Sequence, residues 1–179
     1  DSIERQLVSD VPIGTFLSGG LDSSIISAVA RKHLAQRGER LQTFSVTFKD
    51  NQKYFRKSRF QPNSDEDYIQ LMADFLGSEH HSVVIDTPQL VEALYAAVDA
   101  RDLPGMADVD SSLLHFCRLI KKNHVVGLSG ECADEIFGGY PWFHQKEALE
   151  GHTFPWSPDL SVRTGLLLPG AADALRLEE

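Results

Sequence analysis

The sequence predicts an α/β domain with a doubly wound, mainly parallel sheet and helices on both of its faces. Three observations lead to this prediction. Short apolar runs alternate with amphipathic stretches, the spacing between runs leaves room for a helix, and glycine-bearing loops follow the first and the last run. Because parallel strands are joined by right-handed crossovers, ligands are expected beyond the carboxyl ends of the strands, where the strand order reverses.

Four strands are expected, over residues 12–17, 41–48, 80–85 and 124–128. Helices are expected between them, over residues 23–36, 64–77, 87–98 and 111–122. Thr87 is predicted to cap the third helix, and Ser64 with Asp67 to begin the second. Two sets of side chains are predicted to face the core, namely Tyr68, Leu71, Met72 and Phe75 in the second helix and Leu113, Leu114, Cys117 and Ile120 in the fourth.

Composition limits the classes of function. The chain has 179 residues, 42% of them hydrophobic, which suits one packed domain with its core in residues 1–144 and an unassigned segment of that domain in residues 145–179. A net charge of -9 argues against general nucleic-acid binding. The chain contains no apolar run of membrane-spanning length and no signal-peptide pattern, so a cytoplasmic protein is expected, with Cys117 and Cys132 as reduced thiols.

The first glycine-bearing loop is predicted to bind phosphate. It runs Ser18-Gly19-Gly20-Leu21-Asp22-Ser23-Ser24, after a predicted strand and at the start of a predicted helix. Glycines let a ligand approach the backbone closely, while serine hydroxyls and the amides of a helix N-terminus form an anion site. No Lys follows the last glycine, so the Walker mechanism of kinases and GTPases is not supported.

Asp22 predicts a metal ion in this loop. A carboxylate repels phosphate unless a cation such as Mg²⁺ lies between them. The competing interpretation is that Asp22 caps the following helix.

The sequence resembles a known family in two motifs. The Ser18–Ser24 loop is similar to the pyrophosphate-binding loop of the ATP pyrophosphatases, which implies the PP-loop fold that resembles the adenine nucleotide alpha hydrolases. Together with Val11-Pro-Ile-Gly-Thr-Phe-Leu17, the motif Leu128-Ser-Gly-Glu-Cys-Ala-Asp-Glu-Ile-Phe-Gly-Gly-Tyr140 resembles the synthetase domain of glutamine-hydrolysing asparagine synthetases. The resemblance covers about residues 1–144.

The resemblance implies the cofactors ATP and Mg²⁺ and a role for particular residues. It implies that Leu17 and Val46 flank the adenine, and that Asp22 and Asp134 hold Mg²⁺ against pyrophosphate. Glu131 would act in forming and consuming an aspartyl-AMP intermediate. The residues implied to contact ATP are Leu17, Ser18, Gly19, Gly20, Asp22, Ser23, Ser24, Val46, Ser129 and Gly130. Both Glu131 and Asp134 keep a competing interpretation as ordinary loop carboxylates.

The implied reaction is adenylation of the side-chain carboxyl of aspartate, followed by attack of ammonia that glutamine supplies through a glutaminase domain. Residue 1 is Asp, not the family's N-terminal cysteine, so that domain is expected to be missing and the segment alone to be incomplete as a catalyst. Cys132-Ala133 replaces the Gly-Ser of many relatives, with an effect that stays open. A homodimer also stays open.

Two other functions remain open from the sequence. A relative with this fold could form a β-lactam or another amide, or the domain could bind nucleotide without catalysis. His80 and His81 are adjacent on a predicted strand and point to opposite faces, which argues against a shared metal ion. The path of residues 49–63 is not predicted.

Overall fold

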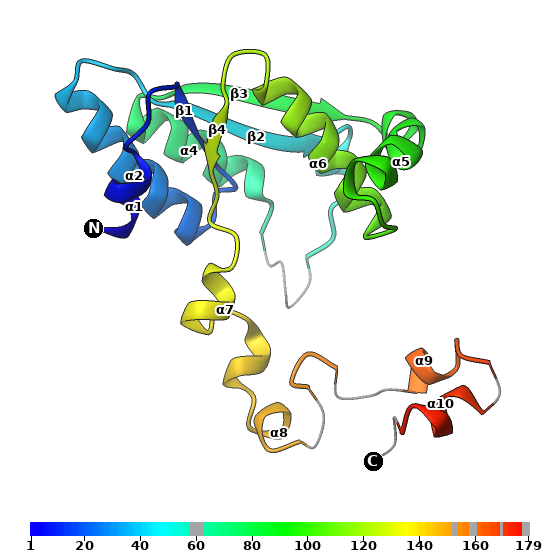
Figure 1. Ribbon diagram of the computed structural model, residues 1–179. Coiled ribbons are helices and arrows are strands. Elements are labelled where there is room, and N and C mark those ends of the chain that lie inside the picture. The colour runs from blue at the N-terminus through cyan, green and yellow to red at the C-terminus, as the bar shows by residue number, and fades with distance from the viewer. Residues whose placement is uncertain (58–62, 152–153, 158–160, 169, 177–179) are drawn as a thin grey trace. The chain divides into compact units, whose positions relative to one another are not determined.

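The first part of the chain forms a parallel sheet. The computed structural model describes residues 1–57, 63–151, 154–157, 161–168 and 170–176. They belong to two compact units, one over Asp1–Gly130 and one from Glu131 onward. The first unit contains a sheet of four strands in the order β3-β2-β1-β4, and every pair of neighbours is parallel. The predicted doubly wound α/β fold is confirmed (Figure 1).

Every predicted strand and helix of this unit is present. The elements are α1 (Ser2–Gln6), β1 (Ile13–Phe16), α2 (Leu21–Gln36), β2 (Gln42–Phe48), α3 (Asn51–Tyr54), α4 (Asp65–Leu76), β3 (Glu79–Ile85), α5 (Thr87–Arg101), α6 (Ala107–Ile120) and β4 (Val126–Leu128). Helices α1 and α3 were not predicted. The short α3 lies in the unassigned segment 49–63, of which residues 58–62 are outside the described part of the chain.

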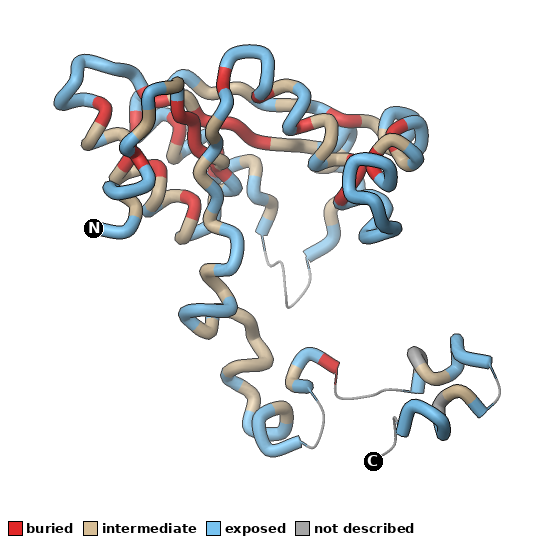
Figure 2. Tube along the Cα trace, in the orientation of Figure 1, coloured by how far each residue is buried: buried red, intermediate tan, exposed pale blue. Residues whose placement is uncertain are grey.

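The two faces of the sheet are covered by different helices. Helices α2 and α4 pack on one face, where Ile13, Leu17 and Leu41 meet apolar side chains of both helices. Helix α6 packs on the other face, where Phe116 and Ile120 meet Phe44, and α5 lies against α6 (Figure 1). Buried residues accordingly follow the strands (Figure 2). The connections from β1 to β2 and from β2 to β3 cross one face of the sheet, and the connection from β3 to β4 crosses the other. The strand order therefore reverses at the junction of β1 and β4.

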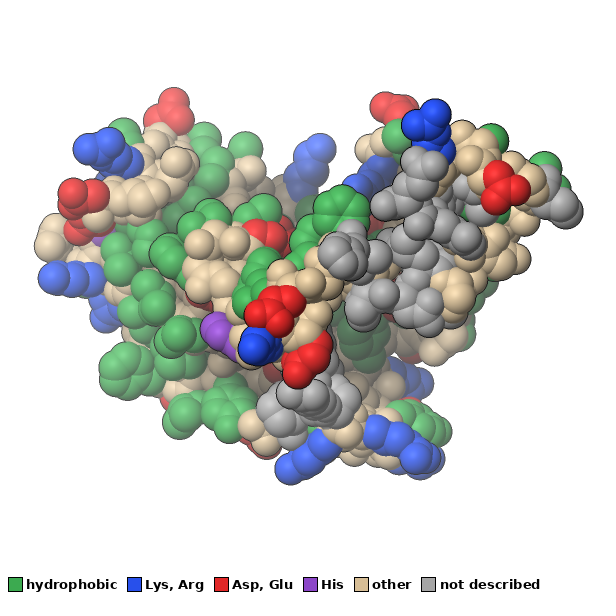
Figure 3. Space-filling view, turned by 90° about the horizontal axis from the view of Figure 1, so that it is seen from below, with side chains coloured by type: hydrophobic (Ala, Val, Ile, Leu, Met, Phe, Trp, Pro, Cys, Tyr) green, Lys and Arg blue, Asp and Glu red, His purple; other side chains and the backbone are tan. Residues whose placement is uncertain are grey.

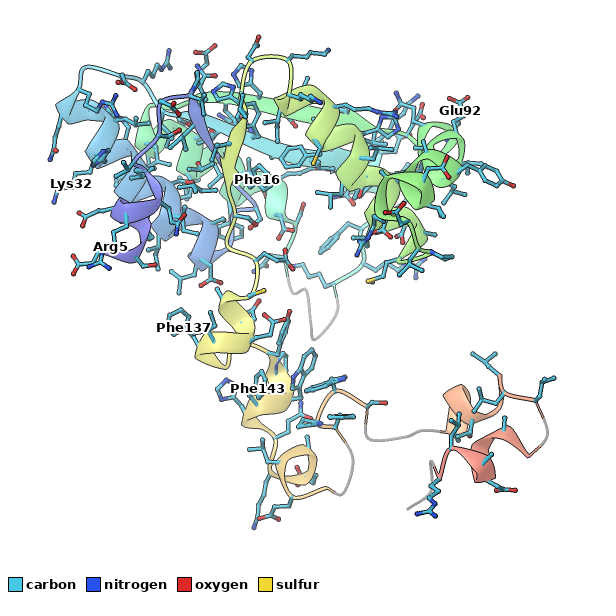
Figure 4. The ribbon with its side chains drawn as sticks, in the orientation of Figure 1. Arg5, Phe16, Lys32, Glu92, Phe137 and Phe143 are labelled. Atoms are coloured by element: carbon cyan, nitrogen blue, oxygen red, sulfur yellow. The ribbon has the colours of Figure 1, made fainter. Side chains whose placement is uncertain are left out.

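Two strand glycines make room for aromatic rings on the α6 face. A Cβ at Gly14 would lie 2.4 Å from the ring of Phe44, and a Cβ at Gly127 would lie 2.4 Å from the ring of Phe16 (labelled in Figure 4). The rings of Phe16 and Phe116 then meet edge to face at 4.8 Å. These glycines cost strand propensity, and the rings use the space they leave.

The predicted core stripe of α4 is wrong except for Met72, which packs against the core. Tyr68, Leu71 and Phe75 are exposed by 45%, 63% and 79%, while the buried residues of α4 are Ile69, Ala73 and Leu76. Both sets have helical spacing, and the packed face is the one that carries a small residue at its centre. Large hydrophobic side chains therefore lie at the surface, as the face drawn in Figure 3 illustrates.

Other local predictions are corrected in the same way. In α6, Leu113 and Cys117 are exposed, whereas Phe116, which was not predicted, is buried with Ile120. The cap of α5 is Asp86 instead of Thr87. Its carboxylate accepts a hydrogen bond from the Gln89 amide, and the Gln89 side chain accepts one from the Asp86 amide.

The start of α4 lacks the expected side-chain cap. Ser64 occupies the N-cap position, but its side chain makes no capping bond. At the other end, Gly77 has the left-handed conformation of a helix C-cap, and Gly38 after α2 has it as well.

The second unit is built from short helices. They are α7 (Ala133–Phe137), the 3₁₀ helix η1 (Pro141–His144), α8 (Lys146–Leu149), α9 (Ser161–Thr164) and α10 (Ala171–Ala174). The rings of Tyr140 and Trp142 stack at 4.3 Å, and Phe143 (labelled in Figure 4) lies beside both. The predicted division of the chain at residue 144 stays a prediction. No helix among the described residues has the length and apolar character that crossing a membrane requires.

Candidate functional site

The Ser18–Ser24 loop turns the chain from β1 into α2. Gly19 has a φ of 77°, a conformation that favours glycine, and Gly20 is the N-cap residue of α2. Side-chain hydroxyls hold the loop in shape: the Ser23 Oγ lies 3.0 Å from the Ser18 Oγ and donates to the Gly20 carbonyl at 3.1 Å. The Ser24 Oγ donates to the same carbonyl at 2.7 Å.

Helix α4 fixes the position of this loop. A Cβ at Gly19 would lie 2.8 Å from the Tyr68 Cβ and 2.9 Å from the Asp65 carbonyl oxygen, so the loop backbone touches the first turns of α4. Residues about fifty positions apart thus meet at a site that only glycine fits.

The loop after β4 meets the loop after β1. A Cβ at Gly130 would lie 3.1 Å from the Asp22 Cβ and 3.3 Å from the Ser23 amide nitrogen. Gly130 therefore lies against the first turn of α2, at the point where the strand order reverses. Within the first unit, the structure brings Ser18–Ser24 together with the Ser129-Gly130 end of the second motif.

The N-terminus of α2 fits an anion. No side chain caps it, so the first amides of a 16-residue helix are not used by a capping group. Such amides and the helix dipole favour a phosphate or carboxylate. Asp22 is in the first turn and does not occupy the N-cap position, so the interpretation of Asp22 as a helix cap is wrong.

A pocket of about 200 Å³ opens beside this loop, at the ends of β1 and β2. It is lined by Phe16, Leu17, Ser18, Phe44, Ser45, Val46, Asp65, Ile69 and Phe116. The Leu17 amide donates to the Phe44 carbonyl at 2.8 Å, which holds the two strand ends together. Leu17 and Val46, predicted to flank one ligand, therefore line one pocket. Its volume suits a flat ring, since complete ligands use larger clefts.

Of the two aspartates predicted to hold a metal ion, Asp22 lies at the loop of the first unit and Asp134 belongs to the second unit. Asp22 is half-buried at the loop, where a carboxylate could hold a hard cation against phosphate. In the described part of the chain, no three or more His, Cys, Asp or Glu side chains gather as a metal cluster. A magnesium ion here would take further oxygen ligands from phosphate and water, as Mg²⁺ commonly does.

The rest of the second motif belongs to the second unit. Glu131 is exposed, and Cys132 begins α7 with a φ of 69°. Asp134 is half-buried, and its carboxylate lies so close to Gly139 that a Cβ there would be 1.9 Å from Oδ1. Gly139 thus leaves room for this carboxylate.

Tyr140 closes the motif by donating a hydrogen bond to Glu135 at 3.1 Å. This bond, with smaller contributions from desolvation and from nearby carboxylates, raises the pKa of Tyr140 above its ordinary value. The Tyr140 hydroxyl therefore keeps its proton to a higher pH than an ordinary tyrosine.

Sequence analysis did not predict several residues of the pocket. Asp65, Ile69 and Phe116 come from the covering helices, and Ser45 comes from β2. The one available signal was the alternation of Thr43, Ser45 and Thr47 with apolar residues. It showed that one face of β2 is polar without showing what contacts it.

A parallel sheet with a glycine loop and an uncapped helix N-terminus at its switch point has the architecture of the phosphate-binding α/β domains. The family model described as asparagine synthase matches residues 1–179. The chain therefore belongs to the asparagine synthase family, and the resemblance inferred from its two motifs is confirmed.

Individual relatives agree with this assignment. The chain is 54% identical over 180 residues to asparagine synthetase [glutamine-hydrolyzing] 3 of Bacillus subtilis, covering 100% of this chain and 29% of that protein. It is 33% identical over 148 residues to asparagine synthetase B [glutamine-hydrolyzing] of Escherichia coli, covering 81% of this chain and 26% of that protein. The chain thus spans less than a third of the length of these curated relatives.

Among solved structures, an NAD+ synthetase from Burkholderia pseudomallei is similar with a TM-score of 0.43 and 13% sequence identity. The similarity covers 79% of this chain and 54% of that chain.

Proposed function

We propose that this chain is part of the synthetase domain of a glutamine-hydrolysing asparagine synthetase. It binds Mg-ATP, transfers AMP to the side-chain carboxyl of aspartate with release of pyrophosphate, and lets ammonia displace AMP to give asparagine. Glutamine supplies the ammonia through a glutaminase domain. The cytoplasm is the proposed location, in keeping with Cys117 and Cys132 being free and exposed.

One observation supports this proposal most directly. The loops after β1 and β4, which carry the two motifs, meet where Gly130 lies against Asp22 and Ser23. A nucleotide with its phosphates on the α2 N-terminus would have the pocket of Leu17 and Val46 beside it for its base.

The residues of the site have distinct proposed roles. Ser18, Gly19, Gly20, Ser23 and Ser24 surround the phosphates, with Ser129 and Gly130 closing from the next loop. Asp22 and Asp134 hold Mg²⁺, which when bound offsets the charge of the pyrophosphate leaving group. Glu131 positions the reacting carboxyl and accepts a proton from the attacking ammonia.

Exchange of labelled pyrophosphate into ATP tests the first half-reaction, with the protein that contains this chain. Exchange that depends on aspartate, with asparagine formed when glutamine or ammonia is added, is the expected result. Replacing Glu131 by Gln should lower asparagine formation at least about 100-fold, since general-base groups contribute roughly that much. The matched control is Glu147→Gln, another exposed glutamate of the second unit, which should change little.

Other outcomes identify the competing functions. Tight ATP binding without exchange for any carboxylic acid would favour a non-catalytic nucleotide-binding module. Exchange that depends on a different carboxylic acid would favour a synthetase of another amide or of a β-lactam. Either result contradicts the proposal.

A further inference from the structure

A row of polar side chains runs beneath the pocket, between β2, β3 and α4. The Ser45 Oγ lies 3.0 Å from the His80 Nε2, and the His80 Nδ1 lies 2.9 Å from the Thr43 Oγ1. The Thr43 Oγ1 lies 2.9 Å from the Ser78 Oγ, which donates to the Ala73 carbonyl at 3.4 Å. Apart from His80, which is half-buried, these polar side chains are buried. The parallel register that pairs Thr43 with His80 brings them together.

The Ala73 carbonyl gives this row a direction. A carbonyl oxygen can only accept a hydrogen bond, so the Ser78 hydroxyl donates its single hydrogen to the Ala73 carbonyl. The Ser78 oxygen must then accept a hydrogen bond from the Thr43 hydroxyl. Thr43 then accepts from the Nδ1–H of His80. The Nε2 of a neutral imidazole is left as an acceptor, and Ser45 donates to it. This order makes all four bonds, whereas the reverse order leaves the Ser78–Ala73 bond unmade.

The Ser45 hydroxyl consequently has no hydrogen left for a ligand. Ser45 lines the pocket beside Leu17 and Val46, and a ligand group that reaches its hydroxyl oxygen there meets only lone pairs. A base with an N–H donor suits such an oxygen, and a base with a carbonyl at the same place does not. Adenine carries an amino donor at C6.

We propose that Ser45 selects a purine that carries an amino group at C6, and that His80 is a positioning residue that keeps the Ser45 oxygen an acceptor. This inference rests on the proposed function, because it assigns the pocket to the base of the nucleotide. It concerns side chains that neither motif contains.

The state of His80 agrees with the geometry. Its burial, and to a smaller extent electrostatic repulsion from the neighbouring His81, lowers the pKa of His80 below its ordinary value of 6.5. At neutral pH the ring is therefore uncharged, and Nε2 keeps the lone pair that Ser45 needs.

Competition between nucleotides tests the selection. Dissociation constants would be measured by calorimetry for the magnesium complexes of ATP and of purine riboside triphosphate, which lacks the C6 amino group. The protein that contains this chain should bind ATP about 2- to 10-fold more tightly, the ratio that one hydrogen bond supplies. The ratio should fall to about 1 in Ser45→Ala. Equal binding by the unchanged protein, or an unchanged ratio in Ser45→Ala, would overturn the inference.

A second pair of variants tests the positioning role. His80→Asn retains an amide near the Nδ1 position but has no atom at Nε2, so the Ser45 hydroxyl becomes free to donate. The preference for ATP over inosine triphosphate, whose C6 group is a carbonyl, should then shrink. His115→Asn is the matched control, because His115 lies against the Gln89 carbonyl of α5 and does not line the pocket, so it should leave the ratio unchanged.

Nitrogen NMR of His80 provides a test that uses the unsubstituted protein and does not depend on whether a variant folds. The expected tautomer has its proton on Nδ1, and a proton on Nε2 would overturn the direction of the row. Failure of this inference is distinct from failure of the proposed function. A protein that binds ATP without preference refutes the inference alone, whereas one that binds no nucleoside triphosphate refutes both.

Discussion

Replacing Gly19 by Ala should destabilise the first unit and damage the phosphate loop. Gly19 has a φ of 77°, and a residue with a Cβ costs about 1–2 kcal/mol in that conformation. The new methyl group would also lie 2.8 Å from the Tyr68 Cβ and 2.9 Å from the Asp65 carbonyl oxygen, where backbone of α4 has to move. Overpacking of this kind costs about 1–3 kcal/mol. A total loss of about 2–5 kcal/mol in the free energy of unfolding is expected.

The matched control for this prediction is Gly38→Ala. Gly38 has a nearly equal φ of 71°, but a Cβ there meets nothing within 4 Å. It should therefore cost only the backbone contribution of about 1–2 kcal/mol. Urea titration followed by circular dichroism measures both variants, and the difference between them isolates the contact with α4. Equal losses would refute the packing of the loop against α4, and with it the account of why glycine is needed at this position.

Two further predictions concern charge. Asp22→Asn should weaken binding of Mg-ATP at least about 10-fold in calorimetry, because the carboxylate attracts phosphate only through the cation. Metal-free ATP should bind as before or more tightly. Equal affinity of the two proteins for Mg-ATP would contradict the metal role of Asp22. Stability to urea should fall between pH 7.5 and pH 5.5, because the pKa values of His80 and His124 lie below their ordinary value of 6.5 in the folded protein, so the unfolded chain binds more protons as the pH falls through that value. The fall should be smaller in His80→Gln; the lowered pKa of Glu66 acts only near and below its ordinary value of 4.5 and does not disturb this window.

The fold could be predicted from the sequence because its signals are local. Apolar runs separated by amphipathic stretches located every strand of the sheet, and right-handed crossovers then fixed the faces that the helices cover. The orientation of α4 could not be predicted in this way. Tyr68 and Ile69 start equally regular apolar stripes, and the stripe that packs is the one that meets Leu17 and Leu41, which are far away in the sequence.

The candidate site shows the same division. Its loops were found from contiguous motifs whose glycines and acidic residues have a chemical meaning on their own. The row from Ser45 to Ser78 was not found, because it depends on the register between β2 and β3. A shift of one residue would turn His80 to the opposite face of the sheet. Side chains that act through a partner on another strand give no signal in a single sequence.

The glycines of the sheet connect packing with the proposed site. Gly14 and Gly127 leave space on the α6 face into which the rings of Phe44 and Phe16 extend, and both rings then line the pocket beside the phosphate loop. A larger residue at either glycine would overlap a ring that lines the pocket, so that ring would have to move. Residues inside the strands therefore influence the shape of a cavity formed at their ends.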